Sequence, residues 1–298
     1  MAREVATMEM VYHIGAHCTD EDRLLKCLLK NQGSLSREGI VVPAPSRYRP
    51  VLREMLVSLR GRAATEEQQQ IVLDAVMDED DARRLVFSNE SFICMPQKVL
   101  EQHMLYPMAG EKSNWLSQLF PNDPCVFFLG VRNPATFIPA LFQRSNEADF
   151  TAFIAGVDPR RLLWSDTVRR IRNANPDAEL VVWCNEDTPL IWTELLQVLS
   201  GCQEGTELRG SLDFLATLMS DAGLKRMRAY LESNPPVNAV QRRKVIAAFL
   251  DKYAIPEAVE EELDLPGWTP ELVDEMTERY EEDLYEIEDM QGVRFIAP

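Results

Sequence analysis

The chain lacks the short motifs that mark many nucleotide, metal and acyl-transfer enzymes. It has no G-x-x-x-x-G-K-[ST] loop and no G-x-G-x-x-G turn, which excludes a Walker-type triphosphatase and removes the dinucleotide fingerprint. It also has no H-E-x-x-H pattern and no G-x-S-x-G elbow. The three histidines, His13, His17 and His103, do not have the spacing of metal ligands, so we expect no metal site.

Paired cysteines and long apolar runs are missing as well. The six cysteines form no C-x-x-C pair, and Cys94, Cys125 and Cys184 lie in or beside apolar, strand-like runs. This usage is typical of reduced core thiols, so we expect a cytoplasmic protein without disulfides. No run approaches the roughly 18 apolar residues of a membrane helix, and the N-terminus lacks a secretory pattern. We therefore expect no membrane association.

Basic residues are scarce, and the acidic ones are concentrated near the end of the chain. The net charge is −17, and the segment from Glu257 to Asp289 contains 15 acidic residues and one basic residue, Arg279. Nucleic acid is not an expected partner, because no basic stripe interleaved with aromatics is present to neutralise phosphates. We expect the acidic segment to be a solvated helix face. An alternative is that it docks onto a basic partner.

Strand-like and helix-like segments alternate through residues 1–200, the part expected to form an α/β core. The expected strands are Met10–Ile14, Ile40–Pro45, Leu85–Phe92, Cys125–Arg132 and Glu179–Glu186. The expected helices open at about Thr19, span Pro50–Leu59 and Thr65–Met77, and start again at about Pro134. This alternation predicts a three-layer fold, in which helices cover both faces of a parallel sheet.

Each expected strand except the second becomes polar where it ends. The polar tips are His17, Ser88–Ser91, Arg132–Asn133 and Asn185–Asp187. Because binding sites in such folds lie at the carboxyl ends of the strands, we expect these tips to converge.

Residues 201–298 are expected to be helical and to belong to the same single domain as the core. Asn238 is a good N-cap for a helix whose apolar face contains Val240, Val245, Ile246, Phe249 and Leu250. Thr269–Pro270 should open a last helix, with an apolar stripe at Leu272, Met276, Tyr280, Leu284 and Ile287. The prolines of Ser233–Asn238 are expected only to separate two helices.

Two segments of the chain resemble the donor motifs of sulfotransferases that use 3′-phosphoadenosine 5′-phosphosulfate (PAPS). YHIGAHCTDEDRLL lines up without gaps with the loop H-I-G-x-H-K-T-G-T-T-S-L of bacterial members, and VRNPATFIPALF supplies the R-[DN]-P of the second motif. The resemblance extends to FSNESF, to WSDTVRRIRNANPDAELVVWCNEDTP and to a Tyr-x-x-Asp pattern at Tyr280–Asp283. It thus spans nearly the whole chain, and it implies a fold of the P-loop nucleoside triphosphatase and sulfotransferase type.

The resemblance also implies roles for single residues. The donor, or its product 3′-phosphoadenosine 5′-phosphate (PAP), would be held by a loop and two arginines, namely Gly15, Ala16, His17, Cys18, Thr19, Arg23 and Arg132. Glu90 matches the position of a general base that would deprotonate an acceptor hydroxyl, with His17 beside it. The acceptor would be a carbohydrate, a lipid or a small molecule. Each residue also has a structural alternative: an ion pair for Arg132, a helix cap or salt bridge for Glu90, and a packing role for His17.

The donor motifs depart from the family at five positions. Cys18 replaces the lysine, Asp20 the glycine, Glu21 and Asp22 the two hydroxyls, and Ala140 the serine of the second motif. A phosphosulfate beside three carboxylates would cost about 1–4 kcal/mol per close pair. Thr19 and Asp22 instead have the spacing of a self-contained capping box.

Two hypotheses therefore remain open: a divergent sulfotransferase, or a catalytically inactive relative that serves as a binding or regulatory protein. A Mg²⁺ site at the three carboxylates is a further alternative, although acidic residues at a helix start need no metal to explain them. The oligomeric state is not predicted.

Overall fold

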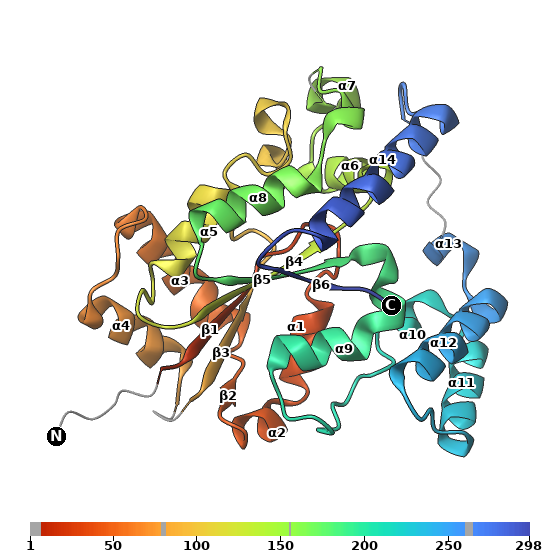
Figure 1. Ribbon diagram of the computed structural model, residues 1–298, viewed down its shortest axis with the longest axis horizontal. Helices are drawn as coiled ribbons and strands as arrows, with labels where there is room; N and C mark the ends of the chain where they lie inside the picture. Colours follow the sequence, from red (N-terminus) through yellow and green to blue (C-terminus); the bar gives the residue numbers. More distant parts are fainter. Residues whose placement is uncertain (1–6, 79–81, 155, 260–264) are drawn as a thin grey trace.

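The computed structural model describes residues 7–78, 82–154, 156–259 and 265–298. Its centre is a six-stranded, all-parallel sheet in the order β2-β3-β1-β4-β5-β6 (Figure 1). The strands are β1 (Glu9–His13), β2 (Ile40–Val41), β3 (Arg84–Ser88), β4 (Cys125–Val131), β5 (Glu179–Cys184) and β6 (Val293–Ile296). The α/β class with a parallel sheet is therefore confirmed.

Helices cover both faces of the sheet. The α-helices are α1 (Arg23–Leu29), α2 (Gln32–Ser36), α3 (Pro45–Leu59), α4 (Glu66–Val76), α5 (Ala109–Ser117), α6 (Pro134–Ser145), α7 (Phe150–Ile154), α8 (Trp164–Ala174), α9 (Thr188–Ser200), α10 (Leu215–Leu218), α11 (Asp221–Ser233), α12 (Ala239–Tyr253), α13 (Pro256–Val259) and α14 (Pro270–Glu288). Short 3₁₀ turns lie at Pro96–Lys98, Glu101–His103, Pro159–Arg161 and Asn185–Asp187.

Alternate residues of each strand build two separate cores. In β1, Met10 and Tyr12 belong to the core that includes side chains of α3, α5, α6, α8 and α14, whereas Val11 belongs to the core that includes α1 and α9. Side chains of a strand point alternately to opposite faces, so a central strand must be apolar on both. This explains why continuous apolar runs predicted β1, β4 and β5 to within about two residues at their ends.

The C-terminal part contains more than the expected helices. Helices α10, α11 and α12 build a third, smaller core beyond α9, and Asn238 caps α12 by accepting a hydrogen bond from the Gln241 N–H at 2.8 Å. Only Ile246 of the expected apolar face of α12 is fully buried. In addition to helices, residues 201–298 contain β6, which pairs with β5 over Leu180–Trp183 at the edge of the sheet.

Helix α14 crosses the sheet face on the α8 side and has the predicted start and stripe. The Thr269 hydroxyl accepts a hydrogen bond from the Leu272 N–H, and Leu272, Met276, Tyr280 and Ile287 are buried. Its outer faces carry the acidic residues. Glu275 pairs with Arg160 and Glu286 with Arg169, both outside the helix, and Glu282 pairs with Arg279 of α14 itself. Residues 260–264 of the acidic segment lie outside the described residues.

Candidate functional site

The candidate site lies where the loops after β1, β3 and β4 leave the carboxyl end of the sheet. His13 pairs with Ser88 of β3 on one side and with Phe128 of β4 on the other. The chain leaves β1 toward β2 at one edge, and leaves β4 toward β5 at the other. The loops after β1 and β4 therefore lead in opposite directions. The crevice between them is the usual location of a binding site in a parallel α/β sheet.

The loop after β1 continues along β4 before it turns away. The Ala16 N–H donates to the Gly130 carbonyl at 3.0 Å, and the Gly130 N–H donates to the Gly15 carbonyl at 2.8 Å. Gly15 has a φ of +111°, and a Cβ there would lie 3.2 Å from the His17 backbone nitrogen and 3.5 Å from the Glu90 Cα. Only glycine fits this backbone and this spacing. Gly15 therefore brings the loop close to Glu90.

His17 is enclosed completely, with 0% of its surface exposed. Its backbone N–H donates to the Tyr106 hydroxyl at 2.9 Å, and its ring Nδ1 lies 2.7 Å from the same oxygen. Burial, with a smaller contribution from the Arg144 charge, lowers the pKa of His17 to about 4. The imidazole is therefore neutral at pH 7. Its contacts hold the loop in place, as a packing residue would.

The prediction of a capping box between Thr19 and Asp22 is wrong, and so is the prediction that a helix begins at about Thr19. The Thr19 hydroxyl donates to the Ala16 carbonyl at 2.7 Å, and α1 begins only at Arg23. Glu21 and Asp22 have φ values of +50° and +61°, so the backbone leaves the helical path between Thr19 and Arg23. The loop therefore wraps into a left-handed turn before the helix begins.

Each acidic residue of the loop is satisfied by a different group of the chain. The buried Asp20 accepts a hydrogen bond from the Leu24 N–H at 3.0 Å, within the first turn of α1. The Asp22 carboxylate accepts two hydrogen bonds from Arg49 of α3, at 2.6 and 3.3 Å. Glu21 pairs with Arg23 at 3.0 Å on the surface. The three carboxylates thus point to separate partners rather than to a common ligand.

Arg132, at the end of β4, is brought to the same loop. Its Nη1 donates to the Cys18 carbonyl at 2.7 Å, and its Nε donates to the Thr136 hydroxyl at 3.0 Å. The structure therefore joins two parts of the sequence that the resemblance assigned to one donor site. The guanidinium holds the backbone of the loop at Cys18, the position that the family's lysine occupies.

Glu90, at the end of β3, forms an ion pair with Arg144 of α6. Burial raises the pKa of Glu90 above its usual value, Arg144 opposes the rise, and the nearby Asp22 and Asp20 add to it. Arg144 lies one helical turn after Ala140, which takes the place of the family's serine. Glu90 therefore belongs to an ion pair beside the loop, the alternative that the sequence offered.

The polar tips of β4 and β5 are also joined. Glu186 accepts hydrogen bonds from the Asn133 N–H at 2.8 Å and from the Tyr280 hydroxyl at 3.0 Å. Three residues after Tyr280, the buried Asp283 accepts from the Trp164 N–H at 2.6 Å and from the Ser165 N–H at 3.1 Å. The Tyr-x-x-Asp pattern therefore attaches α14 in two places: Tyr280 binds the residues that follow β5, and Asp283 caps the start of α8. The predicted convergence of the tips is confirmed.

Three residues of the site lie outside every motif quoted from the sequence. Arg49, Tyr106 and Arg144 come from segments that no motif singles out, and only folding brings them to the loop. A helical spacing argument from Ala140 would have found Arg144, which is four residues further along α6. No comparable pattern points to Arg49 or Tyr106.

The described residues offer no metal cluster and no membrane-spanning helix. In the described part of the chain, no group of three or more His, Cys, Asp or Glu side chains is placed to hold a metal ion. None of the described helices is both long and apolar enough to cross a membrane. The six cysteines are free thiols. A scan against protein-family models and a search of curated proteins found no match to this chain.

Proposed function

We propose that this chain has a fold of the P-loop and sulfotransferase type and is a non-catalytic relative of the PAPS-dependent enzymes, acting as a binding or regulatory protein. The observation that carries the proposal is the state of the loop after β1. Asp20 accepts a hydrogen bond from the Leu24 N–H at the start of α1, and Asp22 accepts hydrogen bonds from the Arg49 guanidinium. Groups that would face a donor phosphosulfate are thus bound by the protein's own carboxylates.

Electrostatics supports the same conclusion. A phosphosulfate seated at this loop would lie beside Asp20 and Asp22, at about 1–4 kcal/mol for each close like-charge pair. The lysine that would offset this cost is missing from its place in the motif, because Cys18 occupies that position and burial raises the pKa of the Cys18 thiol to about 11. The neutral thiol cannot replace the charge of a lysine ammonium group.

A divergent but active sulfotransferase is the second candidate. Two observations favour it: Arg132 contacts the loop at Cys18, and Glu90, with its raised pKa, lies beside Gly15. A carboxylate of raised pKa suits a general base that removes a proton from an acceptor hydroxyl. In this case Arg132 and the Gly15–Thr19 segment would hold the donor, and Glu90 would have to leave Arg144 to reach the acceptor.

Calorimetric titration with PAP, the desulfated donor product, separates the two candidates. For a non-catalytic relative we expect no heat of binding at millimolar PAP from a protein that melts cooperatively. A dissociation constant tighter than roughly 100 μM, about 5.5 kcal/mol, would contradict the proposal. If that binding were also lost in Arg132→Ala, the active candidate would replace it.

A further inference from the structure

A groove away from the sheet edge is lined by α9, α12 and the segment 206–211. It consists of two adjoining cavities of about 270 and 430 Å³ that share Thr193, Gln197 and Arg242. Pockets for small molecules in proteins typically have volumes of about 300–1,000 Å³. None of the residues of the loop after β1 lines this groove, so it is separate from the candidate site described above.

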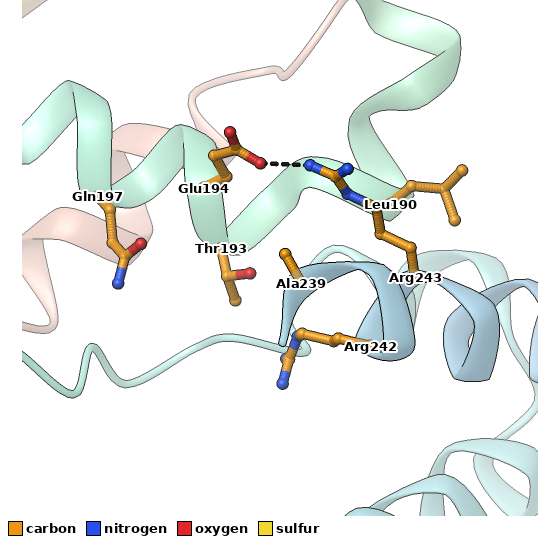
Figure 2. Close-up of a pocket in the computed structure, with 7 residues that line it drawn as sticks. All are labelled: Leu190, Thr193, Glu194, Gln197, Ala239, Arg242 and Arg243. Atoms are coloured by element: carbon orange, nitrogen blue, oxygen red, sulfur yellow. Dashed lines mark hydrogen bonds and ion pairs between the residues drawn. The ribbon is translucent and has the colours of Figure 1, made fainter. Parts of the chain in front are cut away.

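The lining is polar and comes from two facing helices. Figure 2 shows Thr193 and Gln197 projecting from the same side of α9, and the Arg242 side chain lying along α12 below Ala239. Thr206 and Ser211 border the second cavity. Hydroxyl and amide groups of this kind fix the orientation of a small polar ligand.

Among the described residues, Arg243 has a carboxylate partner and its neighbour Arg242 has none. Arg243 pairs with Glu194 at 2.6 Å along one wall of the groove (Figure 2). The Nε and Nη2 atoms of Arg242 are buried and have no hydrogen-bond partner in the described structure. Glu207, which also lines the second cavity, is exposed to solvent. In the described part of the chain, Arg242 is thus a cation beside a polar groove with no carboxylate hydrogen-bonded to its Nε or Nη2.

An unpartnered guanidinium in this position costs the folded protein stability. Buried polar groups are nearly always hydrogen-bonded, and a charged one left without a partner is expensive. Burial also lowers the pKa of Arg242 from its ordinary value. Nε and Nη2 lie on the same edge of the guanidinium plane, the edge that binds a carboxylate or phosphate through two parallel hydrogen bonds.

We propose that this groove binds a small organic anion, whose carboxylate or phosphate group pairs with Arg242 and whose polar body contacts Thr193 and Gln197. Both nitrogens are out of reach of solvent in this structure. Binding therefore requires the Arg242 side chain to rotate about its flexible stem until that edge faces the groove. The anion then supplies the two hydrogen-bond acceptors that the protein does not.

The test is an NMR titration of the arginine Nε–Hε signals, with inorganic phosphate and acetate as separate probes and sodium chloride at matched ionic strength as the reference. We expect one signal, absent from the spectrum of Arg242→Lys, to shift saturably with a dissociation constant of roughly 1–10 mM for phosphate or acetate. The tighter of the two probes identifies the anionic group. In Arg242→Gln, binding measured by calorimetry should weaken by about tenfold or more.

Lys244→Gln is the matched control, because Lys244 is an exposed cation on the same helix and lines neither cavity. It should bind both probes as the unchanged protein does. Arg242→Gln should melt at the same temperature or higher, since it removes an unpartnered charge. The proposal is overturned if phosphate and acetate act only as chloride does, if Lys244→Gln weakens binding equally, or if Arg242→Gln fails to fold.

Discussion

The folded protein should lose about 3 kcal/mol of stability through His17 alone when the pH falls from 6.5 to about 4. Burial lowers the pKa of His17, so the fold keeps the imidazole neutral where the unfolded chain takes up a proton. Unfolding therefore binds a proton in this window, and stability falls as the pH falls. Above pH 6.5 the imidazole is neutral in both states and the effect vanishes.

Urea denaturation at a series of pH values measures this effect, with His17→Gln as the variant. The variant should lack the His17 part of the pH dependence, so the stability difference between the two proteins should change by about 3 kcal/mol across the window. His103→Gln, which alters an exposed histidine, should follow the unchanged protein. A constant difference between His17→Gln and the unchanged protein would show that the imidazole is not enclosed as described.

Replacing Asp283 by alanine should destabilise the protein by about 3 kcal/mol. The carboxylate of Asp283 accepts hydrogen bonds from the Trp164 and Ser165 N–H groups at the start of α8, and all three residues are buried. Without it, two buried donors lose their acceptor, and α8 loses one of its contacts with α14. Each unsatisfied buried donor costs about 1–3 kcal/mol.

Equilibrium unfolding in urea is again the measurement, and Glu282→Ala is the control. Glu282 is exposed on the same helix, and its ion pair among the described residues is the exposed one with Arg279, so its removal should change stability by less than about 0.5 kcal/mol. Asp283→Asn keeps one oxygen acceptor and should fall between the two. An equal, small effect of Asp283→Ala and Glu282→Ala would contradict the capping role of Asp283.

The sequence predicted the centre of the fold well and its edge poorly. Strands buried on both faces, such as β4, must be continuous apolar runs, and such runs are visible without any knowledge of the partners. β6 has only four residues and pairs with one neighbour, so its existence depends on β5 being in place. The turn before α1 was missed for a related reason, because the contact of Asp22 with Arg49 is made across 27 positions of the chain.

The part of the candidate site that the sequence predicted consists of residues directly after a strand, where a motif could be read. Arg132 and the Gly15–Thr19 segment meet as expected, because both follow central, neighbouring strands. The partners that decide the chemistry, Arg49 and Arg144, lie on helices whose sequences are ordinary. Arg49 pairs with Asp22 of the acidic loop, and Arg144 pairs with Glu90 beside it.

Ion pairs within the chain bear on the role of the acidic C-terminal segment. Part of its negative charge is neutralised by arginines of the same chain, because Glu275 and Glu286 of α14 pair with Arg160 and Arg169. These pairs are exposed, and such pairs typically contribute less than about 1 kcal/mol each. They favour the expectation of a solvated helix face over a docking surface for a basic partner.

In the proposed function, the protein's own carboxylates close the donor site at the loop after β1. The direct test restores the family loop in the quadruple variant Cys18→Lys, Asp20→Gly, Glu21→Thr and Asp22→Thr, and titrates it with PAP by calorimetry. We expect a dissociation constant on the order of 100 μM or tighter, against no heat from the unchanged protein. The triple variant that keeps Cys18 should bind more weakly, because it lacks the lysine. A cooperatively folded quadruple variant that gives no heat with millimolar PAP would contradict the account.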